Sequence, residues 1–198
     1  MGNILSRLRF LASELMLGSL IAILSVFTAV ASYQGSMSDS EQTANNVQGQ
    51  QRLTDANAEY LTANQLIVYD YQLYDGWYTA EDEDKANYYQ ANFSEELQAS
   101  LQNSPDDIFN DAYYEAMYAD ANSLFNEAQA RFDKAEEWNK RGDALQLVML
   151  IMALGLAFAA WASLLQEESK MRILFSALSI GMFVYGLITY LNVPVVAG

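Results

Sequence analysis

The stretch EEWNKRGDALQLVMLIMALG, residues 136–155, changes character halfway along. Its first eight residues include five charged ones, whereas its last eleven carry no charge. No proline and no cluster of turn-forming residues separates the two halves. Such a pattern is typical of a helix that begins in water and continues into lipid. We therefore expect a membrane protein whose spanning helices extend beyond the bilayer.

Three uncharged apolar runs of about 20 residues occur in the chain. An α-helix rises about 1.5 Å per residue, so ~20 residues cross the ~30 Å hydrocarbon core of a bilayer. We predict an all-α integral membrane protein with three transmembrane helices, formed by residues 15–33, 145–165 and 173–191. The chain then has three parts: 1–34 with the N-terminus and span one, 35–143 as an acidic outer region, and 144–198 with spans two and three and a short tail.

Basic residues near the span ends predict the orientation in the membrane. Arg7 and Arg9 precede the first span, and Lys170 and Arg172 lie in the short loop before the third. Because cytoplasmic loops are enriched in Lys and Arg, we expect a cytoplasmic N-terminus and an extracytoplasmic region 35–143.

The apolar run ending in AVAS fits a signal peptide, which we expect to stay uncleaved as an anchor. The opening MGNILS fits a myristoylation pattern, but one acyl chain would add little to three spans.

The second half of the outer region is predicted to form one long helix. Ser104 fits an N-cap with Pro105 at the first helical position, and Asp106 and Asp107 would face the positive end of the helix dipole. Small and aromatic residues then recur every three or four positions, past Gly142 and into span two. The residues of this seam are Tyr114, Tyr118, Ala121, Phe125, Ala128, Phe132, Ala135, Trp138, Gly142 and Leu145. We expect an unbroken helix from Pro105 into the second span.

A matching seam follows span one. Its residues are Leu53, Ala56, Tyr60, Ala63, Ile67, Tyr71, Tyr74 and Tyr78. Large and small residues alternate in both seams, so two antiparallel helices can interdigitate. A shorter helix over residues 81–103 is expected to fold back between them. The predicted fold is therefore a helical hairpin or three-helix stalk that continues spans one and two outside the membrane.

Charge and composition exclude several classes of function. Residues 34–143 hold 22 of the 25 acidic residues and six of the ten basic ones, a local net charge of −16. This charge argues against nucleic acid as a partner and fits cations or basic proteins. The chain has no Cys and no His, which excludes disulfides, thiol chemistry, haem and the usual zinc sites. No spacing indicates a nucleophile-and-base pair, so we expect neither an enzyme nor a cofactor.

The candidates for a metal site are acidic. Glu81, Asp82, Glu83 and Asp84 form an uninterrupted run, and Asp70 precedes it. Carboxylate oxygens suit a hard cation, but the spacing misses the calcium-loop pattern because the glycine falls one position late. The alternative is an acidic helix N-terminus on a solvated tip.

Aromatic residues gather in the same region. Ten tyrosines and Trp77 lie between residues 60 and 118, many of them beside acidic residues. Such aromatics can form a cup for a sugar or a cation. More often they pack a slender helical bundle with their hydroxyl groups at the wet rim, and we favour that interpretation.

Small residues within the spans recur at helix-packing distances. Such spacing lets two membrane helices approach closely, within one chain or between subunits. The predicted contact residues are Gly155, Ala159, Ser163, Ala177 and Gly181. Because the acidic outer regions of two copies would repel each other, we expect these membrane helices to provide most of the assembly contacts.

The chain resembles a known family in its architecture. One N-terminal span, an outer helical region containing YLTANQ, and two C-terminal spans beginning RGDALQLVMLIMALGLAFAAWASLL are similar to bacterial membrane proteins grouped as domain of unknown function family 4337. The resemblance covers the architecture along most of the chain. It implies a location in the bacterial inner membrane and supplies no activity.

Taken together, these features predict a non-catalytic membrane protein that works by assembly. We expect homo-oligomers or association with other membrane-protein subunits in the lipid bilayer, with cations at the acidic outer region. One alternative is a sensor-like transducer, because a span, helical hairpin and span resemble the ligand-binding half of a chemoreceptor. Another is a cation-conducting oligomer with acidic vestibules.

Overall fold

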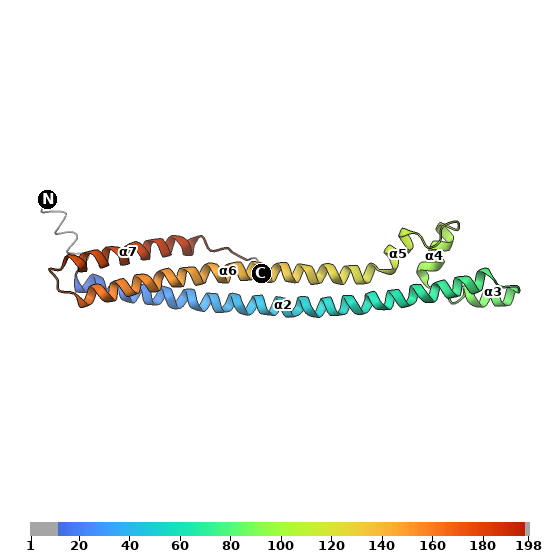
Figure 1. Ribbon diagram of the computed structural model, residues 1–198, viewed down its shortest axis with the longest axis horizontal. Helices are drawn as coiled ribbons and strands as arrows, with labels where there is room; N and C mark the ends of the chain where they lie inside the picture. The colour runs from blue at the N-terminus through green and yellow to red at the C-terminus, as the bar shows by residue number, and fades with distance from the viewer. Residues whose placement is uncertain (1–11, 197–198) are drawn as a thin grey trace. The chain divides into compact units, whose positions relative to one another are not determined.

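The computed structural model describes residues 12–196, and this part of the chain is all α-helical (Figure 1). It contains six helices and no strand. In chain order, the helices are α2 (Glu14–Tyr78), α3 (Glu83–Gln90), α4 (Glu95–Asn103), α5 (Asp111–Met117), α6 (Ala119–Leu164) and α7 (Lys170–Leu191). The predicted all-α class is confirmed.

The three predicted spans fall within long helices. α2, α6 and α7 each contain a stretch that is long and apolar enough to cross a bilayer. α6 continues through Gly142 without a break over its 46 residues, as the absence of a helix breaker predicted. Arg7 and Arg9, on which part of the orientation rests, lie outside the described residues, and so does the MGNILS pattern.

Polar side chains set the starts of α3, α4, α5 and α7. Ser, Asp and Asn are favoured at N-caps because their side-chain oxygens accept hydrogen bonds from free amides of the first turn. The caps and the amides that they accept from are Asp82 and Lys85 (2.9 Å), Ser94 and Leu97 (3.0 Å), Asn110 and Tyr113 (3.1 Å), and Ser169 and Met171 (3.3 Å).

The predicted helix start at Pro105 is wrong. The segment between α4 and α5 forms turns, and the next helix begins after Asn110. Asn110 caps α5 and also donates from its side-chain amide to the Asp107 carbonyl oxygen at 2.7 Å. Ile108 is buried, and its carbonyl oxygen accepts a hydrogen bond from the Ser100 hydroxyl. Residues 105–110 therefore pack against α4 as turns, and the helix begins only at Asp111.

Two further breaks interrupt helices that the sequence predicted to be continuous. Tyr118 separates α5 from α6, with its ring stacked on Tyr60 at 5.0 Å and its hydroxyl donating to Asn64 Oδ1 at 2.7 Å. The expected helix over residues 81–103 is also divided, into α3 and α4. The buried side chain of Phe93 lies between these two helices and belongs to the core.

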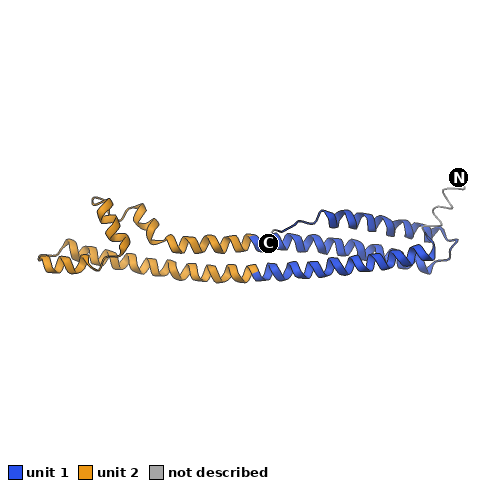
Figure 2. Cartoon of the chain, turned by 180° about the vertical axis from the view of Figure 1, so that it is seen from behind, with its two compact units in different colours: residues 1–44, 134–198 blue, residues 45–133 orange. Residues whose placement is uncertain are grey.

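The chain consists of two compact units (Figure 2). Unit 1 comprises residues 1–44 and 134–198, and it packs parts of α2 and α6 with α7. Unit 2 comprises residues 45–133 and includes α3, α4 and α5. The core of unit 1 consists of Leu24, Ala31, Val148, Met152 and Ala159. The core of unit 2 consists of Ile67, Leu73, Phe93, Leu97, Ile108, Tyr113 and Met117.

The buried face of α2 in unit 2 departs from the predicted seam at three tyrosines, because Tyr60, Tyr71 and Tyr78 are exposed. Ala63 and Ile67 are buried as expected, but the next buried residues are Asp70 and Leu73. Tyr71, which the seam placed in the core, is 40% exposed. The aromatic residue therefore lies at the rim, and a carboxylate takes its place inside.

Candidate functional site

Asp70 is the centre of a buried polar cluster in unit 2. Its side chain is 2% exposed and accepts three hydrogen bonds. The Ser94 amide donates to Oδ1 at 3.1 Å, the Ser94 hydroxyl to Oδ2 at 2.5 Å, and the Tyr113 hydroxyl to Oδ2 at 2.8 Å. A buried carboxylate is tolerated when hydrogen bonds compensate for its lost hydration. The cluster therefore joins α2 to the start of α4 and to α5.

The tyrosines around this cluster stay protonated well above neutral pH. Burial, and then the hydrogen bond to Asp70, raise the pKa of Tyr113 far above its ordinary value. A hydrogen bond with Tyr71, and then burial, raise the pKa of Tyr114 to about 12. A raised pKa stabilises the neutral hydroxyl, so its contribution to stability is complete below about pH 10 and is lost only as the pH rises further.

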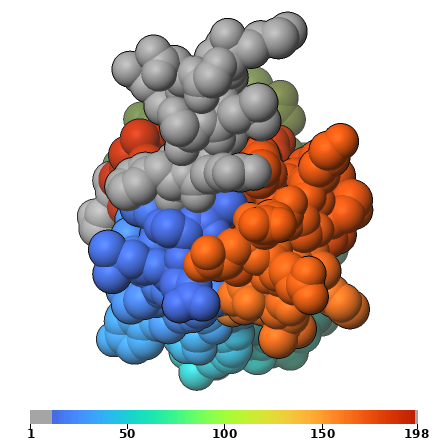
Figure 3. Space-filling view, turned by 90° about the vertical axis from the view of Figure 1, so that its left-hand side faces the viewer, coloured from blue at the N-terminus to red at the C-terminus, as the bar shows by residue number. Residues whose placement is uncertain are grey.

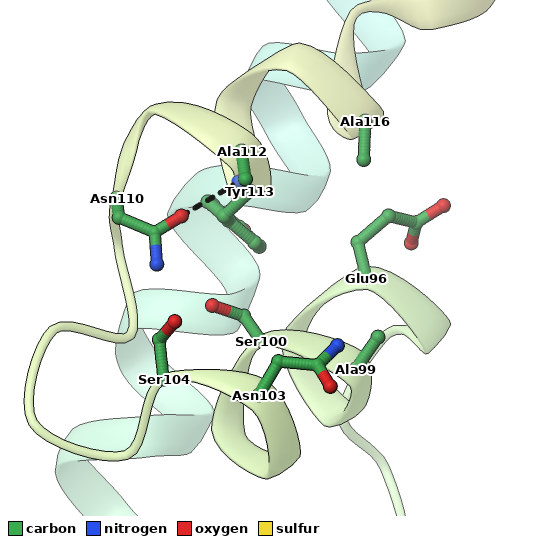
Figure 4. Close-up of a pocket in the computed structure, with 9 residues that line it drawn as sticks. All are labelled: Glu96, Ala99, Ser100, Asn103, Ser104, Asn110, Ala112, Tyr113 and Ala116. Atoms are coloured by element: carbon green, nitrogen blue, oxygen red, sulfur yellow. Dashed lines mark hydrogen bonds between the residues drawn. The ribbon is translucent and has the colours of Figure 1, made fainter.

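A small cavity of about 230 Å³ lies between α4 and α5 (Figure 4). Ser100, Ser104 and Asn110 direct polar groups towards it, and the dashed line marks the bond between Asn110 and the Tyr113 amide. Glu96 adds a carboxylate at the edge of the lining. Ala99, Ala112 and Ala116 also line it, so the cavity has the size for a small molecule and a lining of mixed polarity.

The acidic run has a structural role at the start of α3. Asp82 is the N-cap, Glu83 and Asp84 lie in the first turn, and all of the run from Glu81 to Asp84 is exposed. Among residues 12–196, no three carboxylates are grouped in a way that could hold a metal ion. Asp70, the earlier acidic candidate, binds Ser94 and Tyr113 instead. Cation binding by the run stays a prediction.

Gly155 and Ala159 lie at a helix contact inside unit 1. A Cβ atom on Gly155 would lie 3.1 Å from Met182 Cβ and 3.2 Å from Leu24 Cδ2, so the absence of a side chain lets the three helices approach closely. The Ser179 hydroxyl donates to the Gly155 carbonyl oxygen at 2.7 Å. Ala159 is fully buried in the same core. These two residues therefore hold one chain together.

The other three predicted contact residues lie on the surface. Ser163 is exposed, and its hydroxyl donates to the Ala160 carbonyl oxygen at 2.7 Å. Ala177 and Gly181 are exposed on α7, and a Cβ atom on Gly181 would meet no atom within 4 Å. Gly155 and Ala159 on α6 have the same four-residue spacing as Ala177 and Gly181 on α7, but only the pair on α7 is exposed.

Arg172 connects three helix ends of unit 1. Its side chain is 2% exposed, its Nε donates to the Ala12 carbonyl oxygen at 2.8 Å, and its Nη1 donates to the Leu165 carbonyl oxygen at 2.9 Å. Leu165 follows the last residue of α6, where the helix dipole is negative and favours a cation. Figure 3 shows this end of the unit, with the start of α2 beside the end of α6.

Sequence reasoning missed the burial of both charged residues, Asp70 and Arg172. It used Arg172 only to orient the spans, because nothing in the local pattern distinguishes it from the exposed Lys170. The one available signal for Asp70 is its place three residues after Ile67, in step with the buried face of α2.

Three helices long and apolar enough to cross a bilayer indicate a helical, multi-pass membrane protein, and its second unit contains a buried polar cluster. No family model matches the chain, and neither the curated proteins nor the solved structures gave a match. The resemblance to domain of unknown function family 4337 therefore stays a hypothesis.

Proposed function

We propose that the chain is a non-catalytic membrane protein that acts as a structural or accessory subunit, by assembling with copies of itself or with other membrane proteins. The observation that carries this proposal is the outer face of α7. Ala177 and Gly181 are open there, between the exposed side chains of Leu174, Leu178 and Val184. At such a surface of small residues, a second helix can approach closely and form more dispersion contacts than lipid tails would.

The proposed location is the bacterial inner membrane, with a cytoplasmic N-terminus and residues 35–143 outside. Lys170 and Arg172 lie in the first turn of α7, and Arg172 donates to the Leu165 carbonyl oxygen just after α6, so this end of the spans carries two of the Lys and Arg residues that the positive-inside rule counts. The positive-inside rule then places it in the cytoplasm. The resemblance to the bacterial family supports the same membrane.

Thiol labelling tests this orientation, because the chain has no native cysteine. Ala130→Cys in α6 and Glu168→Cys in the loop before α7 both replace exposed residues. A membrane-impermeant maleimide added to spheroplasts is expected to label Ala130→Cys in intact cells and Glu168→Cys only after lysis. The reverse pattern would place residues 35–143 in the cytoplasm.

Ala177→Leu is expected to weaken assembly at least about tenfold, equivalent to ~1.4 kcal/mol. The larger side chain would keep a second helix away from α7 without disturbing the packing inside the chain, since Ala177 is exposed. Ala160→Leu is the matched control, because Ala160 is an exposed alanine in α6. The measurement is the mass of the detergent-extracted complex across a dilution series. If Ala177→Leu and Ala160→Leu dissociate at the same concentration, the assembly contact does not lie at Ala177 on α7.

The cavity between α4 and α5 favours one alternative function. A small polar ligand bound near Ser100 and Tyr113 would make unit 2 a sensor domain that signals through a partner. Thermal stabilisation of the purified protein by such a ligand, abolished by Ala112→Leu in the cavity lining, would support this alternative. Unchanged stability in the presence of sugars, amino acids and organic acids would exclude it for those ligands.

A further inference from the structure

One face of α2 in unit 2 is exposed along its length and carries no charge. Twelve residues form it, and we call it the open face of α2. They are Val47, Gln50, Gln51, Thr54, Asn57, Ala58, Leu61, Thr62, Gln65, Val68, Tyr69 and Gln72. All twelve are exposed, although they belong to the most acidic part of the chain.

The charged residues of this part of α2 lie elsewhere on the helix. Between residues 45 and 74 there are four, and Asp70 is buried. Arg52 Nε lies 3.2 Å from Glu127 Oε2 on α6, which directs this side of α2 towards α6. Asp55 and Glu59 follow on the same side at helical spacing. Asp55 and Glu59 are exposed, as Arg52 is, but none of the three belongs to the open face.

The exposed part of α6 in unit 2 shows that this is not a general property of the surface. Asp120, Glu127, Arg131 and Asp133 are all exposed there, within 14 residues. Exposed helices of an acidic protein ordinarily carry such charges, because hydration of charged groups keeps the surface soluble. An uncharged face over seven turns of α2 needs a separate explanation.

The open face has the spacing of a coiled coil. Its centre repeats every seven residues, with Leu61 and Val68 61% and 55% exposed and Val47 52% exposed. A second row, three residues before or four after the first, consists of Gln51, Ala58, Gln65 and Gln72. The first row also includes Thr54 and is otherwise aliphatic, and the second row consists of glutamines apart from Ala58. The two rows have the spacing of the a and d positions of a heptad repeat, where a polar residue specifies register.

We propose that the open face of α2 binds the open face of a second copy, with the two α2 helices parallel. Two acidic chains repel each other wherever their charges meet, so a contact between copies requires a face without charge. Glutamine suits such a contact because its side-chain amide both donates and accepts, and can pair with the same residue in the partner. A basic partner would instead be attracted to the acidic residues that this face excludes.

The parallel arrangement rests on the proposed membrane location. α2 includes the first candidate span, so two copies inserted in one bilayer have α2 helices that leave it in the same direction. Because both copies are anchored by the same span, each residue of α2 lies at the same height above the membrane in both copies and faces its own counterpart. Leu61 of one copy then faces Leu61 of the other. This contact adds to the one proposed for α7 and identifies the partner as a second copy.

Single cysteines test the contact in native membranes, since no other thiol is present. Val47→Cys, Leu61→Cys and Val68→Cys are each expected to give a disulfide-linked dimer under mild oxidation, because facing a or d positions come within disulfide reach. Ala130→Cys, exposed on α6, is the control and is expected to remain monomeric. In an antiparallel pair, only a residue near the centre of the contact lies beside its counterpart, so at most one of the three cysteines would form a disulfide. Disulfide-linked dimers of both Val47→Cys and Val68→Cys would therefore establish the parallel arrangement.

A charge substitution provides the second measurement. Leu61→Glu combined with Val68→Glu is expected to reduce cross-linking at Val47→Cys at least tenfold, because like charges would meet across the face. Both side chains are mostly exposed, so helix content by circular dichroism is expected to stay unchanged. Asn126→Glu combined with Ala130→Glu on α6 adds the same charge at exposed positions and is expected to leave cross-linking intact.

The outcomes separate this inference from the proposed function. An oligomeric wild-type protein whose Leu61→Cys variant stays unlinked, or links no more than Ala130→Cys, would overturn the α2 contact alone. Cross-linking of Leu61→Cys to a different protein would also overturn it, because the proposed occupant is a second copy. A wild-type protein that is monomeric and purifies without partners would refute both proposals.

Discussion

Replacing Asp70 with alanine is expected to release α4 and α5 from α2 and to cost unit 2 about 3 kcal/mol. The Ser94 amide, the Ser94 hydroxyl and the Tyr113 hydroxyl would lose their acceptor together. Each unsatisfied buried donor costs about 1–3 kcal/mol, and partial rearrangement keeps the total below the sum. The amides of residues 94–117 should then exchange with deuterium about 100-fold faster, since about 1.4 kcal/mol corresponds to a factor of ten.

Asp75→Ala is the matched control for this change. Asp75 lies five residues further along α2 and is exposed, so its removal changes the charge equally and leaves no buried donor unpaired. Exchange in α4 and α5 is expected to match the wild type. If Asp70→Ala and Asp75→Ala exchange at equal rates, the buried cluster does not hold unit 2 together.

Gly142→Pro is expected to break α6 at the point where it approaches the second span. Proline removes one backbone hydrogen bond and its ring clashes with the carbonyl of residue 138, at a cost of about 3 kcal/mol or more in a helix interior. Gly142 lies inside the 46-residue helix, far from either end. Peptides covering residues 136–147 should therefore exchange at least about 100-fold faster than in the wild type.

Gly142→Ala separates the backbone effect from the effect of added volume. The alanine Cβ would lie 2.9 Å from Asp39 Oδ1, the end of an exposed side chain that can move away. Exchange is expected to stay within a few-fold of the wild type. Proline at position 142 without faster local exchange would mean that the two parts of α6 are not joined by regular helix in the membrane.

The local sequence pattern predicted the long helices, but it failed where contacts between residues far apart in the sequence determine the structure. The spans and the passage of α6 through Gly142 follow from composition and the absence of a breaker, which act along one segment. Both Ser104 and Asn110 are good N-caps by residue type. The structure uses Asn110, and it holds the preceding residues in turns with Ile108 buried and bonded to Ser100, a tertiary contact that a helix-start pattern does not contain.

The buried polar residues were hidden for a similar reason. The Asp70 carboxylate accepts its hydrogen bonds from residues 24 and 43 positions away, so its burial depends on tertiary contacts. Arg172 depends on the Ala12 carbonyl, 160 residues away. Small-residue spacing predicted that Gly155 and Gly181 lie at helix contacts. Packing alone shows that Gly155 is used inside the chain while Gly181 is left open.

The central claim is that the protein acts by assembly, and the mass of the extracted wild-type complex tests it most directly. The protein should be extracted from the membrane in a mild detergent. Light scattering then gives the mass of the complex, from which the mass of the detergent is subtracted to give that of the protein. The account predicts a protein mass of at least twice the 22.2 kDa of one chain, or stoichiometric recovery of another membrane subunit. A protein component of 22.2 kDa alone, in detergent and after cross-linking in native membranes, would contradict it.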